Sequence, residues 1–539
     1  MEGFMSRQRV VVTTLVAALA FLSGGWLMQQ GSSPSQSVYQ QARMFDDVLS
    51  HVADYYVDSL DERQLYRMAI DGMLRELRDP YTGYLDGREL RSLTEQTSGN
   101  YGGVGLQIEY RDGAIVVVVP LADSPAEWAG MMTGDRIVQV DDSATARWNQ
   151  ERAVGALRGP AGTPVSLKVE RPGVTGLLSY RLTRAQIHAR SVRLATMVGD
   201  GVGYVELYSF SEATARELSN AIDSLKGAGM RSLILDLRWN PGGLLDEGVA
   251  VADLFLDPGQ AIVSTRGRAP GATRQLVDRQ PQRYATLPIV VLVNGATASA
   301  AEIVAGALQD HDRALIVGTT SYGKGLVQSV FPLSNQVSLK MTTSKWFTPA
   351  GRSIQRPFRS INDDRDPDDE IAADTTPVDS FRTDRGRIVR GGGGIAPDVV
   401  VRPDSAEIVA RNTLQTALGK NVVKYTDALA AFALGARARQ SVSSPLFEVT
   451  PAIRSQFLGM LQERGVTLEP SIIEATWPFM QKQLGDQTAR FAFGRAGQVL
   501  RQTTDDPVLS NAKRLAARAT SPASLLQIAN QGSPANRQP

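Results

Sequence analysis

The sequence predicts an α/β protein with a layered core of alternating strands and helices, a small β-rich module inserted before the core, and helical regions at both ends. Three observations carry this prediction. Apolar strands and amphipathic helices alternate over residues 187–402. Short strands separated by glycine-containing turns fill residues 99–186. Apolar residues recur at helical spacing over residues 34–98 and 403–539.

Length and composition describe a modular globular chain. At 539 residues the chain is too long for one ordinary core, so we expect several domains. Lysine plus arginine (57) nearly cancels aspartate plus glutamate (56), which leaves no basic field that would favour nucleic acid as a partner. The absence of cysteine excludes disulfides, thiolate metal sites and a cysteine nucleophile.

The first residues predict export. Basic residues precede an apolar run of 19 residues, Val10 to Met28. As a helix this run would reach about 28 Å, close to one hydrocarbon thickness. We therefore expect either a membrane anchor or a cleaved signal, with the rest of the chain outside the cytoplasm.

Two helices are expected after a linker rich in serine, proline and glutamine. Their apolar residues recur at helical spacing from Phe45 to Tyr56 and from Leu65 to Leu77. Pro80 and Gly83 then end the second run.

The core segment contains strands that are continuous apolar runs. The helix "SEATARELSNAIDSLKGAG" precedes the strand "RSLILDLRWNPGG", and the strand "LPIVVLVN" precedes the helix "SAAEIVAGALQD". We expect such strands to be covered on both faces of their sheet. Residues 403–539 carry no chemistry that we identify, and we expect them to pack on the core, oligomerise or dock a partner.

A single serine, Ser299, stands among small residues between the strand "LPIVVLVN" and the following helix. A nucleophilic serine needs a fixed hydroxyl, a base, and N–H donors aimed at the oxyanion. The start of a helix supplies free N–H groups and the positive end of the helix dipole. The position equally suits a plain N-cap, so the local sequence leaves both interpretations open.

The three histidines are poor candidates for the base. His311 follows Ser299 by 12 residues (311 minus 299), which is about 18 Å along a continuous helix. His51 lies in the N-terminal helices and His188 in an interdomain segment. The G-x-S-x-G elbow is also absent, so a Ser-His-Asp triad is not expected.

A lysine offers another base. Lys324 lies between two glycines in "SYGKGLVQ", just after a short strand. Desolvation disfavours a charged amine, and a neutral amine can take a serine proton, as Ser-Lys dyads do. Gln328 could orient that amine through its amide oxygen. Taken alone, Lys324 could equally be an ordinary surface lysine, and Gln328 could be an ordinary polar residue of a strand.

Together these strings resemble the C-terminal processing peptidases, also called tail-specific proteases. The string from "LPIVVLVN" to "GKGLVQ" carries the resemblance, with "LILDLRWNPGG" upstream and "GGIAPDVVV" downstream. In that family a lysine follows the nucleophilic serine by 25 residues and a glutamine follows by four more. Here the separations are 25 (324 minus 299) and 4 (328 minus 324). The resemblance implies that Ser299 is the nucleophile, Lys324 the general base and Gln328 its orienting partner.

The resemblance also implies an oxyanion hole. Either Gly242 or Gly243 in "RWNPGG" would contribute a backbone N–H beside that of Ala300, and the sequence does not distinguish the two glycines. Glu302 and Asp310 are interpreted as polar contacts of the helix rather than catalytic groups.

Residues 99–186 resemble a PDZ domain. The string "YGGVGLQI" stands where that fold binds a peptide carboxylate, while the adjacent strand edge accepts the peptide as an added strand. The implied carboxylate-binding residues are Gly102, Gly103, Val104, Gly105 and Leu106. In this family the PDZ domain gates the protease core, and Arg158 in "LRGPAG" is a candidate coupling residue.

The resemblance covers residues 38–402 and implies an α/β core related in shape to the crotonase layer. The expected parts are a signal or anchor with linker at 1–33, an N-terminal helical part of the protease at 34–98, the PDZ domain at 99–186, the Ser-Lys protease core at 187–402 and a helical C-terminal extension with a disordered tail at 403–539.

The function implied is that of a serine endopeptidase on the periplasmic side of the inner membrane in a bacterial cell envelope. It would recognise free, apolar C-termini of proteins and cleave through an acyl-enzyme, without metal or organic cofactor. A homo-oligomer or a regulatory partner stays open. The alternatives are a non-catalytic PDZ adaptor with an inactive core, which binds exported proteins, and a crotonase-type acyl-CoA enzyme, which the export signal and the PDZ module disfavour.

Overall fold

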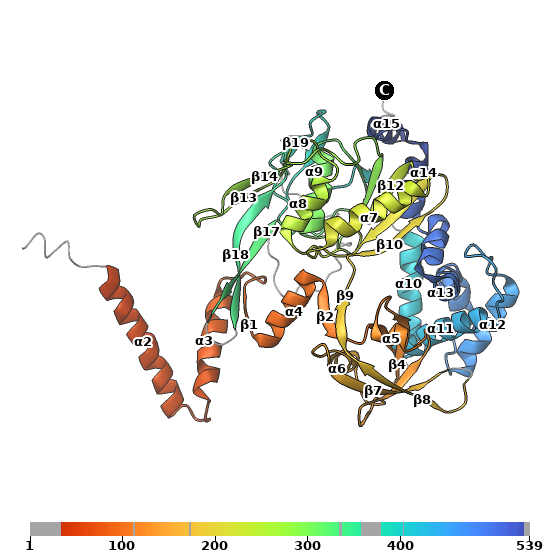
Figure 1. Ribbon diagram of the computed structural model, residues 1–539, viewed down its shortest axis with the longest axis horizontal. Helices are drawn as coiled ribbons and strands as arrows, with labels where there is room; N and C mark the ends of the chain where they lie inside the picture. Colours follow the sequence, from red (N-terminus) through yellow and green to blue (C-terminus); the bar gives the residue numbers. More distant parts are fainter. Residues whose placement is uncertain are drawn as a thin grey trace, which may run out of the picture. The chain divides into compact units, whose positions relative to one another are not determined.

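The computed structural model describes residues 34–111, 114–171, 174–333, 337–356, 379–402 and 404–532. It divides the chain into two compact units, Met1–Tyr84 and Leu85–Pro539 (Figure 1). The predicted export segment and the end of the predicted tail lie outside the described residues. In the described part, no helix combines the length and the apolar character that crossing a bilayer requires.

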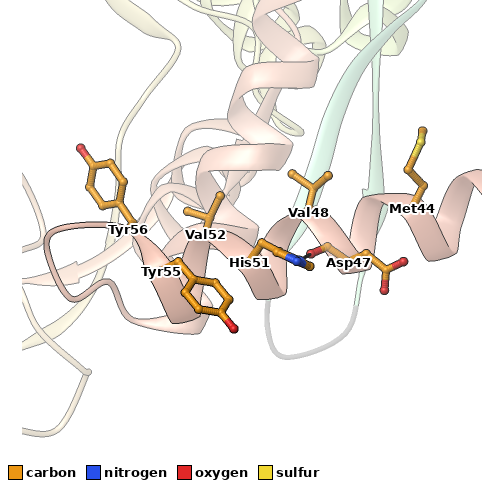
Figure 2. Close-up of a pocket in the computed structure, with 7 residues that line it drawn as sticks. All are labelled: Met44, Asp47, Val48, His51, Val52, Tyr55 and Tyr56. Atoms are coloured by element: carbon orange, nitrogen blue, oxygen red, sulfur yellow. Dashed lines mark hydrogen bonds between the residues drawn. The ribbon is translucent and has the colours of Figure 1, made fainter.

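The first unit contains the two helices that the apolar spacing predicted, α2 (Pro34–Tyr55) and α3 (Glu62–Glu76). Many apolar side chains of α2 are exposed, among them Phe45, Val48 and Tyr55. A shallow groove runs along one side of this helix (Figure 2). Met44, Asp47, Val48, His51, Val52, Tyr55 and Tyr56 line it.

The short strand β1 (Gly83–Leu85) spans the boundary, and α4 (Gly87–Ser98) opens the second unit. Asp86 caps α4 because its carboxylate accepts hydrogen bonds from the N–H groups of Arg88 and Glu89. The Glu89 carboxylate in turn accepts from the N–H of Asp86, which completes a capping box.

The inserted module is a small antiparallel sheet in the order β3-β4-β5-β7-β8, with β6 paired to β5 and a separate ribbon of β2 and β9. Its elements are β2 (Asn100–Gly103), β3 (Leu106–Arg111), β4 (Ala114–Pro120), α5 (Pro125–Trp128), β5 (Arg136–Val140), β6 (Ser143–Ala144), α6 (Gln150–Leu157), β7 (Pro164–Glu170), β8 (Leu177–Thr183) and β9 (Ala185–His188). Inward-facing side chains alternate along β7, as Val165, Leu167 and Val169 show. They pack against Ala153 and Leu157 of α6.

The core is built on a six-stranded sheet in the order β10-β11-β12-β15-β16-β21. Only β10 is antiparallel to its neighbour. The strands are β10 (Val192–Met197), β11 (Val202–Leu207), β12 (Ser232–Asp236), β15 (Ile289–Val293), β16 (Leu315–Gly318) and β21 (Val399–Val400). The connecting helices are α7 (Thr214–Gly227), α8 (Leu245–Asp253) and α9 (Ala300–Asp310).

Two further sheets lie in the core segment. One has β17 (Leu326–Pro332), β18 (Ser338–Phe347), β13 (Ala261–Arg266) and β14 (Arg274–Val277) in that order. The other pairs β19 (Ser380–Arg382) with β20 (Ile388–Arg390).

Both faces of the six-stranded sheet are covered, as the apolar strands predicted. Leu233 and Leu235 of β12 point into a cluster with α7, α8 and α9. Ile234, between them, points to the opposite face, where α14 and α15 pack (Figure 1). Such a two-sided burial explains why the strands lack polar alternation.

The C-terminal extension supplies that second cover. Its elements are α10 (Ser405–Leu418), the 3-10 helix η1 (Gly419–Asn421), α11 (Val422–Ala438), α12 (Pro451–Glu463), α13 (Pro470–Asp505), α14 (Pro507–Arg518) and α15 (Pro522–Gly532). Leu509 and Ala512 of α14 are fully buried on the sheet. Helices α10 to α13 form a separate apolar cluster around Phe457 and Met480. Of the roles that the sequence left open, packing on the core is therefore the one observed.

A buried carboxyl group makes the stability of the core depend on pH. Asp278 follows β14, and one of its side-chain oxygens is buried without a hydrogen-bond partner in the described part of the chain. Burial, followed by the neighbouring carboxylate of Asp253, raises the pKa of Asp278 to about 7. The folded protein therefore holds a proton that the unfolded chain releases near pH 4, so this stabilisation is full below that pH and is lost as the pH rises through 7.

Asp278→Asn should therefore become more stable relative to the parent as the pH rises from 5 to 8, because the amide has no charge to desolvate. Melting temperatures at a series of pH values measure this difference. The same substitution at the exposed Asp123 is the control and should give a difference that does not change with pH. A constant difference for Asp278→Asn would contradict the prediction.

Candidate active site

Three chain segments meet at the carboxyl ends of neighbouring parallel strands. The glycine turn (residues 237–243) follows β12, the serine turn (residues 294–299) follows β15, and the lysine loop (residues 319–325) follows β16. These strands are adjacent in the sheet order β12-β15-β16. Ligands of α/β sheets bind outside this edge, so the topology alone places the three segments where a site is expected.

The serine turn holds Ser299 in a strained conformation. The N–H of Thr297 donates to the carbonyl of Asn294, which closes the turn, and α9 begins directly after Ser299. Ser299 has φ of +56° and ψ of −117°. An ordinary N-cap has an extended backbone, and this conformation costs on the order of 1–3 kcal/mol for a residue with a side chain. Backbone strain of this kind is found most often at functional sites, so Ser299 stays a candidate nucleophile.

The lysine loop is fixed on both sides of Lys324. The carbonyl of Lys324 accepts a hydrogen bond from Trp346 Nε1 at 3.0 Å, and the N–H of Gly325 donates to Gln355 Oε1 at 2.9 Å. Gly323 has φ of +89°, and a β-carbon there would lie 3.0 Å from the N of Gly394. Glycine is therefore required beside the half-buried lysine.

One buried carboxylate joins the serine turn to the lysine loop. Glu302 Oε2 accepts hydrogen bonds from the backbone N–H groups of Ser299 at 2.7 Å and Lys324 at 2.9 Å. Its Oε1 accepts from the N–H of Gly323 at 2.7 Å and from Ser321 Oγ at 2.5 Å. The side chain is 0% exposed. The sequence indicated only a polar contact of the helix at this position, whereas the carboxylate fixes the backbone of both candidate catalytic residues.

The charge of Glu302 is opposed by its burial and supported by its donors. Burial raises the pKa of Glu302, while the hydrogen bonds from Ser321, Lys324, Gly323 and Ser299 act in the opposite direction. Because all four partners are donors, the ionised carboxylate is the form that satisfies every one of them.

The glycine turn lies against Ser299. A β-carbon on Gly242 would be 2.8 Å from Ser299 Cβ and 2.9 Å from the N of Ala300, so no larger residue fits. Asn240 shapes this turn, because its Oδ1 accepts the N–H of Gly242 at 2.8 Å. The carbonyl of Asn240 accepts the N–H of Ala298 at 2.9 Å, which fastens the glycine turn to the serine turn. An Asn-Pro-Gly string is a known sequence signal for such turns.

The hydrogen bonds distinguish the two glycines. The N–H of Gly242 is already engaged, and its carbonyl accepts the N–H of Phe210 at 3.0 Å. In a trans peptide the N–H of Gly243 points opposite to that carbonyl, and therefore away from Phe210. Within the described ranges, neither this N–H nor that of Ala300 has a hydrogen-bond acceptor. Gly243 and Ala300 are therefore the available donors.

Gln328 lies on β17, in the strand that leaves the lysine loop. Its pairing with Thr342 directly follows an irregularity in the β17–β18 register. Its side-chain Nε2 is buried and has no hydrogen-bond partner in the described part of the chain. Its predicted role as a partner of Lys324 stays a prediction.

Two of the three histidines, His311 and His188, contact polar groups of other segments. His311 follows the last residue of α9, at the end opposite to Ser299, and contacts Asp384 Oδ2 at 2.7 Å. His188 lies beside Asn100 and Glu217. The expectation that a histidine is not the base stays a prediction.

The predicted carboxylate-binding residues begin in β2 and end in β3. The carbonyls of Val104 and Gly105 accept hydrogen bonds from Ala126 at 3.0 Å and Leu121 at 2.8 Å. Among the described residues, no acceptor is found for the N–H groups of Val104 and Gly105. Gly102 and Gly103 are paired with β9, and Leu106 is the first residue of β3. Val104 and Gly105 thus present free N–H donors in this loop.

Arg158 lies at the end of α6 beside this loop. Its guanidinium stacks over the ring of Tyr101 at 4.6 Å and bonds to Glu95 of α4 at 2.7 Å. The candidate coupling residue therefore contacts an element outside the inserted module.

Comparisons with known proteins agree with this architecture. The chain matches the models of peptidase family S41 over residues 201–366, the activating protease CtpB N-terminal domain over residues 24–89, and the PDZ domain over residues 116–171. It is 39% identical over 342 residues to the carboxy-terminal-processing protease of Bartonella bacilliformis, which covers 62% of this chain and 78% of that protein.

A second relative and one solved structure are also similar to the chain. The carboxy-terminal processing protease CtpA of Bacillus subtilis is 36% identical over 352 residues, which cover 64% of this chain and 74% of that protein. The solved photosystem II D1 C-terminal processing protease is 30% identical and has a TM-score of 0.36, covering 66% of this chain and 85% of that chain.

Replacing the shared carboxylate should disable the serine without unfolding the protein. In Glu302→Gln one carboxylate oxygen becomes an NH₂ group, which faces two of the four donors. Those two hydrogen bonds cannot form, because a donor cannot accept from another donor. We expect a serine-reactive acylating probe to label Ser299 about 100-fold more slowly. Intact-mass spectrometry follows the labelling. Glu407→Gln, the same change at the ion pair with Lys482, is the control. Labelling of Glu302→Gln at the parent rate would contradict the assignment.

Proposed function

This chain belongs to the carboxy-terminal processing proteases of peptidase family S41, which are serine-type endopeptidases, and on that premise we propose that it cleaves exported proteins near their C-termini with a Ser299–Lys324 dyad. One observation carries the proposal. The Glu302 carboxylate bonds to the backbone N–H groups of both residues, so nucleophile and base are fixed to the same group.

Acylation follows from this arrangement. The Ser299 hydroxyl oxygen attacks the scissile carbonyl carbon while the neutral Lys324 amine takes the hydroxyl proton. The resulting oxyanion accepts hydrogen bonds from the N–H groups of Ala300 and Gly243, and the positive end of the α9 dipole supports the same charge. The C–N bond then breaks, the Lys324 ammonium protonates the leaving amine, and an ester remains on Ser299.

Deacylation reuses the same groups. Water attacks the ester carbonyl carbon while the Lys324 amine takes a proton from the water. The ester C–O bond breaks, Ser299 recovers its proton from the ammonium, and the product leaves as a carboxylic acid that loses its proton to solvent. Gln328 positions the amine through its amide oxygen in both steps, as the spacing of four residues suggested.

Two exposed aromatic side chains favour a substrate with apolar residues near the cleaved bond. Trp239 of the glycine turn is 69% exposed, and Tyr322 of the lysine loop is 41% exposed. The backbone N–H of Trp239 donates to Asn294 Oδ1 and that of Tyr322 donates to the carbonyl of Thr297, so both residues are fastened to the serine turn. Exposed rings fastened to the serine turn would bind apolar residues near the scissile bond.

The PDZ domain would select the substrate by its free C-terminus. The unpaired N–H groups of Val104 and Gly105 suit a carboxylate, and the edge of β3 suits an added peptide strand. We place the reaction on the periplasmic side of the inner membrane, because the run from Val10 to Met28 predicts an anchor or a signal.

The dyad is tested by paired substitutions. Ser299→Ala and Lys324→Ala should each lower kcat by at least about 10³-fold on a denatured protein with an apolar C-terminus, because the steps need both groups. Mass spectrometry of the fragments measures this. Ser329→Ala and Lys340→Ala in β17 and β18 are matched controls and should retain activity. If neither the parent nor any variant cleaves, yet all bind the substrate, the adaptor function is correct.

The PDZ assignment is tested by the peptide terminus. A peptide with a free, apolar C-terminus should bind at least about tenfold more tightly than the same peptide with an amidated C-terminus, because only the carboxylate pairs with the loop N–H groups. Fluorescence anisotropy with Ser299→Ala measures binding without cleavage. Equal affinity for the two peptides would show that the loop does not read the carboxylate.

A further inference from the structure

The glycine turn is fastened to its surroundings at nearly every residue. Toward β15 and the serine turn, Leu237 donates to the carbonyl of Leu292 at 3.0 Å, and the carbonyl of Leu237 accepts from Thr297 Oγ1 at 2.8 Å. Asn240 Nδ2 donates to the carbonyl of Leu207 at 2.7 Å. These contacts all come from the core. Arg238 is the exception.

Arg238 joins the turn to the C-terminal extension. Its guanidinium donates two hydrogen bonds to Asp236 at the end of β12, from Nη2 to Oδ2 at 2.7 Å and from Nε to Oδ1 at 3.0 Å. The remaining Nη1 donates to Asp506 Oδ2 at 2.6 Å. The side chains of Arg238 and Asp506 are 16% and 19% exposed. This pair is therefore largely shielded from water, unlike ordinary surface ion pairs.

Asp506 is itself held in place by two independent contacts. It is the N-cap of α14, and its Oδ1 accepts hydrogen bonds from the N–H groups of Val508 at 2.9 Å and Leu509 at 3.2 Å. Leu509 is buried in the sheet face. The carboxylate thus uses one oxygen to start the helix and the other to bind Arg238. The packing of α14 on the sheet therefore fixes Asp506, and Asp506 in turn fixes Arg238. Arg238 lies five positions before Gly243 (243 minus 238).

The charges around Arg238 indicate what its contact with Asp506 contributes. One guanidinium lies between two carboxylates, so removing the charge of Asp506 leaves Arg238 paired with Asp236. Arg238 would remain ionised and buried with a partner, and the fold would survive. What is lost is the tether between the turn and the extension.

We propose that Asp506 is a positioning residue of the active site, which fixes the Gly243 donor through Arg238, so that the C-terminal extension completes the oxyanion-binding geometry. This inference rests on the proposed function, because it assigns Gly243 to the oxyanion. It gives the extension, which lies beyond the part that resembles the family, a role in the reaction.

The test compares kcat and KM of the full chain with those of Asp506→Asn. The amide keeps an oxygen to cap α14 but removes the ion pair with Arg238. We expect kcat to fall about tenfold with KM within about twofold of the parent, because a displaced oxyanion donor weakens the transition state more than substrate binding.

Arg495→Gln is the matched control. Arg495 forms another ion pair between the extension and the sheet, with Glu206 of β11 at 3.0 Å, and does not contact the glycine turn. We expect this variant to keep the parent kcat, and the melting temperatures of both variants show how far each substitution destabilises the fold. A fall in kcat of the same size in both variants would overturn the proposal, because it would then report stability alone.

A double variant decides whether Asp506 acts through Arg238. Arg238→Gln combined with Asp506→Asn should be no slower than Arg238→Gln alone, since the second change has no tether left to break. The proposal would be overturned if the two losses of kcat multiply in the double variant. It would also be overturned if Asp506→Asn alone keeps the parent kcat. If the parent does not cleave, the proposed function fails separately. The rate at which an acylating probe labels Ser299 then decides, and equal rates in parent and Asp506→Asn would overturn the positioning role.

Discussion

The candidate site depends on the hydrogen bonds that the buried Glu302 carboxylate accepts from the serine turn and the lysine loop. Ser299 and Lys324 lie in different loops after different strands, and each loop presents backbone N–H groups that need an acceptor. A single buried carboxylate supplies that acceptor for both loops, at the expense of desolvating a charge. The strain of Ser299 persists because this junction and the glycine turn fix the backbone on either side.

The layered core explains why such a junction forms here. Strands β12, β15 and β16 are adjacent and parallel, so the glycine turn, the serine turn and the lysine loop emerge at one edge. Helices α7 to α9 cover one face, and α14 and α15 cover the other. The sheet is thereby packed on both faces, and the extension contacts the candidate active-site edge through Arg238.

Much of this could be predicted from local sequence. Continuous apolar strands predicted burial on both faces, and the spacing of Ser299, Lys324 and Gln328 indicated the family. The roles of Glu302 and Asp506 could not be predicted, because each depends on contacts across many residues of the chain that carry no periodic signal. The free N–H of Gly243 could not be predicted either, because it depends on the direction of one peptide plane.

Hydrogen exchange measured by mass spectrometry would test the shared carboxylate most directly. The account predicts that peptides covering residues 297–303 and 321–326 exchange slowly in the parent, and that both lose protection together in Glu302→Gln while peptides from β12 do not. Loss of protection in only one of the two segments, or in neither, would mean that the two loops are held independently and would contradict the central claim.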